Sequence, residues 1–143
     1  MSDSAPEALS DDAELLYRQV HPSFVRDGRP TSQAFRPTPK DENKLSVARD
    51  ALTSASAAYE LFTRGLGPAS AGAWGVTVGE CRHQALPVRP DPLTSPPEKV
   101  ADPAHAVIDF EDISRGQTEA KGARLARSAV ARGRLHPPVN EQE

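Results

Sequence analysis

The chain has 143 residues, a formal net charge of -3 and one cysteine, so it has room for one domain and cannot form an internal disulfide. Its apolar runs fall short of the roughly 20 residues that cross a membrane, and its acidic start lacks the basic and apolar parts of a signal peptide. With the abundance of arginine, alanine and proline, these features predict a cytoplasmic bacterial protein. We expect a disordered acidic lead over residues 1–12, one domain over 13–135 and a disordered tail over 136–143.

Short apolar runs bounded by turn residues predict strands in the first third of the chain. The first strand spans residues 15–20 and ends where His21 precedes a proline. Asp27-Gly28 predicts a turn, and residues 31–36 and 45–48 predict the second and third strands.

The middle of the chain predicts a helix over residues 54–64, with Thr53 as its N-cap and Gly65 at its C-terminal end. Ala58, Leu61 and Phe62 share one face of this helix. Alternation over residues 73–78 predicts a half-buried strand with Trp74 inward, followed by a helical turn. We expect Trp74 and Phe62 to lie in the core.

The prolines of residues 87–103 predict a connector that cannot supply a central strand. A strand over 105–110 and a helix over 117–132 follow. The order of elements predicts an α+β fold, with a small mixed or antiparallel sheet backed by two helices.

Residues 21–47 are rich in polar and charged side chains and contain several prolines, which is typical of a shaped binding surface on a small fold. Arginine suits carboxylate and phosphate groups, so this segment predicts a binding surface, with an exposed Phe24 or Phe35 beside it. The alternative is a solvated connection whose charges pair with Asp27, Asp41 and Glu42. The candidate binding residues are His21, Arg26, Arg29, Ser32, Gln33, Arg36, Lys40 and Asp41.

The patch Leu16-Tyr17-Arg18, followed by His21, Ser32 and Ser46, resembles ADP-ribosyltransferases. In that family an Arg or His on an early strand and a Ser or Tyr on the next hold a nicotinamide cofactor, and a Glu on a later strand supports the developing charge. The resemblance implies catalytic roles for Arg18, His21, Ser46 and Glu111. The alternative is ordinary strand chemistry.

Two further patterns concern metals. Asp109 followed by Glu119 and Lys121 is similar to the acidic core of metal-dependent nucleases, although an acidic first turn of a helix explains Glu119 better. Cys81 and His83 lack the second ligand pair of a zinc site, so we predict no metal and no cofactor.

Lys121, Arg124 and Arg127 recur three residues apart on the last helix and form a basic stripe within residues 117–134. Such a stripe binds nucleic acid through phosphates or is a solvated helix face. The favoured function is a non-enzymatic binding or accessory protein that meets a protein partner through residues 21–47. The alternatives are a nucleotide- or nucleic-acid-directed enzyme of the toxin type, and nucleic-acid binding through the basic stripe.

Overall fold

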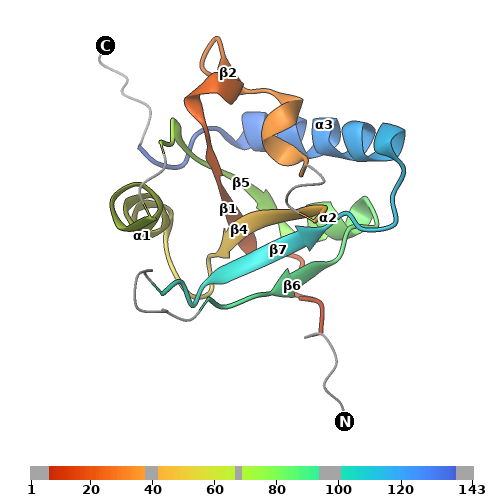
Figure 1. The fold of residues 1–143 in the computed structure, drawn as a ribbon, viewed down its shortest axis with the longest axis horizontal. Coiled ribbons are helices and arrows are strands. Elements are labelled where there is room, and N and C mark those ends of the chain that lie inside the picture. The colour runs from red at the N-terminus through yellow and green to blue at the C-terminus, as the bar shows by residue number, and fades with distance from the viewer. Residues whose placement is uncertain (1–6, 38–41, 67–68, 94–100, 138–143) are drawn as a thin grey trace.

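The computed structural model describes residues 7–37, 42–66, 69–93 and 101–137, and its centre is a five-stranded antiparallel sheet. The strands follow the order β5-β1-β4-β7-β6 across the sheet (Figure 1). In that order they span Gly72–Thr77, Leu15–Val20, Lys44–Arg49, His105–Asp109 and Val88–Pro90. With its helices the sheet forms an α+β fold, which confirms the predicted class.

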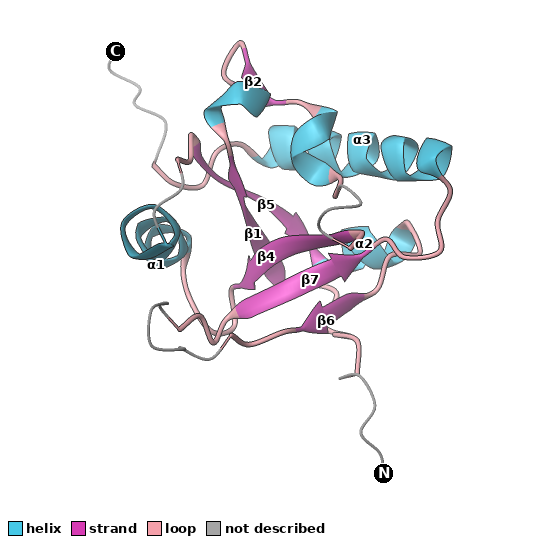
Figure 2. Ribbon diagram, viewed as in Figure 1, coloured by secondary structure: helices cyan, strands magenta, loops and turns pink. Residues whose placement is uncertain are grey.

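The alternation of side chains along β1 separates two faces of the sheet. Leu16 and Val20 point into the main core, which α3 (Arg115–Arg132) covers with Leu125 and Ala129. Tyr17 points the other way and packs with residues of α1 (Ala55–Glu60). Figure 2 shows the two helices set apart, with strands of the sheet between them.

The segment after β1 forms η1 (Pro22–Phe24), a hairpin and a second turn of 3-10 helix. The hairpin pairs β2 (Val25–Arg26) with β3 (Arg29–Pro30). Asp27 and Gly28 both have positive φ, of 55° and 77°, as the favoured two-residue hairpin turns require, so the predicted turn is confirmed.

The strand predicted over residues 31–36 is wrong, because this segment forms the 3-10 helix η2 (Ser32–Phe35). Two adjacent residues, Ala34 and Phe35, are fully buried, and a strand would point them to opposite faces. η2 packs closely on α3 at Gly122, where an added Cβ would lie 3.0 Å from the carbonyl oxygen of Phe35. The contact with α3 therefore decides the local structure.

The helix predicted over residues 54–64 forms, with two differences. Its N-cap is Ser54, whose Oγ accepts a hydrogen bond from the Ala57 amide at 3.1 Å, and not Thr53. The α-helical part ends at Glu60 and continues as the π-helix η4 (Leu61–Leu66), so Gly65 lies inside this element and not beyond it. π-Helical turns are rare in proteins, and those that occur are often found at functional sites.

β5 is confirmed as a strand, but it is buried on both faces and not on one. Its second face is covered by Leu15 and Leu135, which approach so closely that a Cβ on Gly75 would lie under 3.0 Å from both. The edge of β5 is also occupied, since the Ala73 amide donates to the carbonyl of His136 at 2.7 Å. The last described residues thus add to this edge.

β7 and α3 agree with the predicted order, whereas β6 is a strand within residues 87–103, where only a connector was predicted. α2 (Val78–His83) is the helical turn after β5, and β6 lies at the sheet edge, where its Pro90 is tolerated. Next to β6, the Leu9 amide donates to the carbonyl of Val88 at 2.7 Å, so this part of the predicted lead contacts the domain. Within the described ranges, no helix combines the length and the apolar character needed to traverse a lipid bilayer.

The two residues predicted for the core differ in burial. Trp74 is 3% exposed in the main core, whereas Phe62 is only partly buried and lines a pocket. The core prediction is confirmed for Trp74 and wrong for Phe62.

We expect Trp74→Ala to lower the free energy of unfolding by about 3–5 kcal/mol, because it removes a large buried side chain and leaves a cavity. Phe62→Ala should lower it by less than about 2 kcal/mol, because part of the ring already faces solvent. Urea denaturation of both variants measures the difference. Equal losses would show that η4 packs more tightly than the structure indicates.

Candidate functional site

β1 and β4 pair over only part of their length. The register joins Leu16 to Arg49 and Tyr17 to Ala48, and beyond Tyr17 β1 pairs only with β5. β4 meanwhile stays with β7 over its whole course, so the sheet opens between its first and second halves (Figure 1). Backbone groups along this opening need partners from elsewhere.

Arg18 supplies one such partner to β4 and also binds η2. Its Nε donates to the carbonyl of Ala34 at 2.8 Å, and its Nη1 donates to the carbonyl of Ser46 at 3.1 Å. The planar guanidinium therefore links β1, η2 and β4. The opening between the strands is held at a defined width by this side chain.

A pocket of about 260 Å³ lies on the sheet face opposite α3, beside this opening. β1 and β4 contribute consecutive residues to its floor, Tyr17–Gln19 and Ser46–Ala48, and α1 with η4 forms a wall over them. Its surface is mainly apolar, although about half of the lining residues carry polar groups; they are Tyr17, Arg18, Gln19, Ser46, Val47, Ala48, Thr53, Ala58, Leu61, Phe62, Leu93, Asp102 and His105. Small-molecule sites commonly have this composition.

Gln19 is the polar residue of the pocket whose hydrogen bonding is incomplete. Its Oε1 accepts a hydrogen bond from Ser70 Oγ at 2.9 Å. Its Nε2 is buried and has no hydrogen-bond partner among the described residues. Buried polar atoms without partners are uncommon in folded proteins, and this one has no accessible surface through which a molecule in the pocket could contact it.

His105 lies at the start of β7, where Asp91 contacts one side of its ring. The ring Nδ1 is 3.0 Å from the Asp91 carbonyl oxygen and 3.1 Å from its carboxylate Oδ2. Two acceptors on this side place the ring proton on Nδ1 in the neutral imidazole, which leaves Nε2 as an acceptor.

Tyr17 is held as a neutral phenol. Its hydroxyl donates to Asp50 Oδ1. Burial, followed by the hydrogen bond and the negative charge of Asp50, raises the pKa of Tyr17 above its usual value. The side chain is therefore a fixed wall of the pocket and not a base.

The structure brings together two of the four residues that the resemblance to ADP-ribosyltransferases implied. Arg18 and Ser46 both line the pocket. His21 is exposed and its Nδ1 accepts from the Ser23 amide at 3.0 Å, whereas Glu111 pairs with Lys44 at 3.3 Å. Neither His21 nor Glu111 contributes to the pocket lining, so the four residues do not form one cluster.

The polar residues of the segment 21–47 are distributed over several elements. Arg26 and Arg29 are exposed on the hairpin, Ser32 and Gln33 belong to η2, and Lys40 and Asp41 lie outside the described residues. Arg36 pairs with Glu119 at 3.5 Å.

A groove of about 540 Å³ runs between this segment and the start of α3. Aromatic, aliphatic and charged residues share its lining, which consists of Phe24, Gln33, Arg36, Pro37, Asn43, Ile113, Arg115, Thr118 and Glu119. The expectation of an exposed Phe35 is wrong, because Phe35 is fully buried in the core, and Phe24 is partly buried against it.

The nuclease-like residues each have a different partner. Asp109 pairs with Arg89 at 3.3 Å, Glu119 pairs with Arg36, and Lys121 donates to the carbonyl of Gln84. In the part of the chain that the structure describes, no group of three or more His, Cys, Asp or Glu side chains is placed to hold a metal ion. Cys81 is fully buried, and burial together with the charge of Glu80 raises its pKa to about 12.

The basic side chains of α3 mainly contact the rest of the protein. Lys121 and Arg124 both bind Gln84, the latter through its side-chain Oε1 at 2.9 Å. Arg127 is exposed. Two residues of the predicted basic stripe therefore bind Gln84, although Arg124 is also exposed, as Arg127 is.

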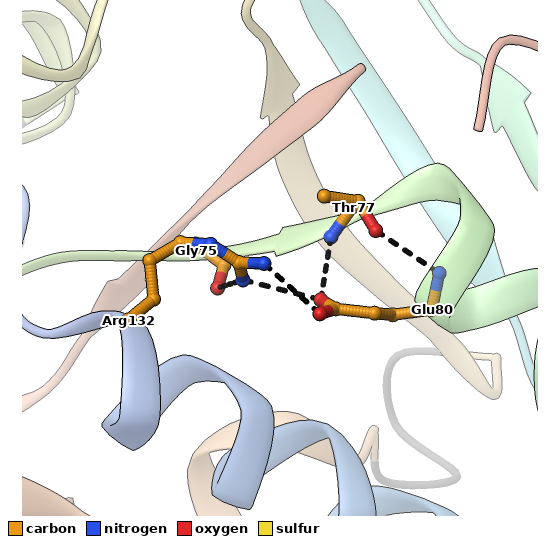
Figure 3. Close-up of polar contacts among 4 residues, drawn as sticks. All are labelled: Gly75, Thr77, Glu80 and Arg132. Carbon is orange, nitrogen blue, oxygen red and sulfur yellow. Dashed lines mark hydrogen bonds and ion pairs between the residues drawn. The ribbon is translucent and has the colours of Figure 1, made fainter. Parts of the chain in front are cut away.

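Arg132 makes the most extensive of these contacts (Figure 3). It donates to Glu80 through both terminal nitrogens, at 3.1 and 2.9 Å, and to the carbonyl of Gly75 at 2.8 Å. Glu80 also closes a capping box with Thr77 at the start of α2. Burial acts to raise the pKa of Glu80, but hydrogen bonds from Arg132 and Thr77 outweigh it, so the net pKa is lowered.

No protein-family model, curated protein or solved structure matches the chain. The functional argument therefore depends on the geometry of the pocket. Tyr17, Gln19 and His105 were missed as site residues by the sequence analysis. Alternation would have placed Tyr17 with Gln19 and Ser46 with Ala48 on shared faces, but nothing in the sequence indicated that α1 and η4 enclose that face.

We expect Arg18→Lys to destabilise the protein by about 2 kcal/mol, because an ammonium group does not span both carbonyl acceptors. Lysine keeps the positive charge, so a loss of stability in this variant would report on the geometry of the hydrogen bonds. Arg26→Lys, on the exposed hairpin, is the matched control and should have little effect. Unfolding midpoints in urea that are the same for both variants would argue against a bridging role of Arg18.

Proposed function

We propose that this protein binds a small ligand in the pocket between the sheet and the α1–η4 wall. The observation that carries the proposal is the pocket itself, about 260 Å³ in volume, with a mainly apolar surface to which residues such as Arg18, Gln19 and His105 add polar groups. The adjoining opening between β1 and β4 supports it, because two neighbouring strands that stop pairing lose backbone hydrogen bonds that a small sheet would otherwise form.

Binding is favoured over catalysis because two polar groups of the pocket already make hydrogen bonds within the protein. The Tyr17 hydroxyl is engaged by Asp50, and Arg18 donates to two backbone carbonyls. Both groups shape the pocket and are not poised to exchange protons with a substrate. The proposal includes the cytoplasmic bacterial setting that the composition suggests, with one buried thiol and many arginines.

The test is NMR titration of the wild-type protein with indole, an apolar ring of suitable size. We expect amide shifts on β1, β4 and α1 around Tyr17, Ala48 and Ala58. Ala48→Leu should weaken binding by at least about tenfold, because the larger side chain fills the pocket floor.

Ala120→Leu, on the exposed part of α3, is the control for Ala48→Leu and should bind indole as the wild type does. Shifts scattered over the surface, or binding that Ala48→Leu leaves intact, would contradict a ligand site in the pocket.

A second candidate is a protein partner bound through the segment 21–47. The groove between η2 and α3 favours it, because Phe24 and Ile113 lie there among charged residues at its rim. The basic stripe is a weaker alternative for nucleic acid, since Lys121 and Arg124 already bind Gln84.

The groove proposal predicts that a Phe24→Ala, Gln33→Ala variant loses a partner that the wild-type protein captures from bacterial cytosol. A variant at Arg64 and Glu60, an exposed ion pair between η4 and α1 and away from the groove, serves as the control. Mass spectrometry identifies the captured proteins. Identical captures for the wild type and the groove variant would count against this surface.

A further inference from the structure

We infer that the ligand of this pocket is a small amine, whose protonated nitrogen is bound by Asp102 and His105 where the chain enters β7. The inference rests on the proposed function and specifies the chemistry of the ligand. It follows from the polar groups of the lining that have accessible surface and make no contact within the described part of the protein.

Asp102 places a negative charge in the lining of a mainly apolar pocket. Its backbone is fixed, because its amide donates to the carbonyl of Leu93 and its carbonyl accepts from the Leu93 amide, both at 3.0 Å. Its carboxylate has no hydrogen bond or ion pair with any described residue, and its oxygens are accessible. A charge beside apolar surface is stabilised by a partner of opposite sign, so this carboxylate favours a cation.

His105 adds an uncharged acceptor in the same turn, since its amide donates to the Asp102 carbonyl at 3.2 Å. Asp91 contacts Nδ1 through its carbonyl and its carboxylate oxygen, so the proton of the neutral ring lies on that nitrogen. Of the two ring nitrogens, Nε2 is the one that a ligand can reach, because it is accessible and lacks a partner among the described residues. It can accept a hydrogen bond from an N–H group of the ligand.

The positive charge of the lining does not offset this preference for a cation. Arg18 uses its Nε and Nη1 to donate to the backbone carbonyls of Ala34 and Ser46. A ligand carboxylate beside Asp102 would place two negative charges together. A protonated amine offers both a positive charge for Asp102 and further N–H donors for His105, and hydrogen bonds between charged groups are the stronger ones.

The rest of the ligand is expected to be apolar because of what surrounds this turn. Leu61 and Phe62 of η4, together with Leu93, belong to the lining. Ala48 lies directly opposite His105 in the sheet, and its small side chain leaves the floor beside the imidazole open. A single aromatic ring on a short chain suits the volume of about 260 Å³.

A matched set of three compounds tests the preference for a cation. Phenethylamine is positively charged at neutral pH, phenethyl alcohol is uncharged and phenylacetate is negatively charged, and all three carry a ring on a short chain. Isothermal titration or NMR should show that the wild-type protein binds the amine about tenfold more tightly than the alcohol, as one charge-assisted hydrogen bond would give. Phenylacetate should bind more weakly than both.

Variants assign the preference to residues. Asp102→Asn should remove the preference for the amine over the alcohol, while its backbone can still pair with Leu93. His105→Leu should weaken binding of the amine severalfold but keep the order of amine over phenylacetate, because the carboxylate remains.

Asp112→Asn is the matched control, since it removes the same charge at an exposed position beyond the far end of β7. It should bind all three compounds as the wild type does. Circular dichroism confirms that each variant is folded.

The outcomes separate this inference from the proposed function. Indole binding in the pocket together with equal affinities for the three compounds, or without binding of the amine, would overturn the inference alone. An amine preference that survives in Asp102→Asn, or an amine affinity that His105→Leu leaves unchanged, would overturn it as well. Failure of indole and of all three compounds to bind would overturn the proposed function, and the inference with it.

Discussion

The guanidinium of Arg18 occupies the place where two neighbouring strands stop pairing. Beyond Tyr17 the backbone of β1 belongs to β5 and that of β4 belongs to β7, and Arg18 donates to the carbonyls of Ser46 and Ala34. An arginine can do this because its donors are fixed in one plane and keep their charge when partly buried. The sheet is thus opened without leaving these two carbonyls unpaired.

This opening explains why the pocket lies where it does. The face toward α3 carries the main core, in which Leu16, Val76 and Ile108 are fully buried. The other face is covered only in part, by α1 and η4, and the pocket lies between these elements and the strands. The main core and the pocket therefore lie on opposite faces of the same sheet.

The charges of α3 serve the fold in a similar way. Arg132 joins the end of α3 to Glu80 at the start of α2 and to the backbone of β5, and Lys121 and Arg124 hold Gln84 at the end of α2. A short helix such as α2 has little stability of its own. Its position between β5 and β6 depends on these contacts from a longer helix.

Several features of the protein were determined by local sequence. The apolar run 15–20, the alternation around Trp74 and the Asp27-Gly28 turn each depend on propensities that act over a few residues, and the α+β class follows from their order. Of the four catalytic residues that the resemblance to ADP-ribosyltransferases implied, Arg18 and Ser46 line the pocket, whereas His21 and Glu111 do not.

Only the tertiary structure decided the rest. Residues 32–35 form a 3-10 helix because α3 approaches them at Gly122, almost 90 positions later in the chain. Gln19 and His105 share a pocket because β4 lies between their strands and η4 borders them, and strand order across a sheet is not encoded in any local pattern. Local periodicity shows which face of a strand a residue occupies, whereas long-range packing determines what covers that face.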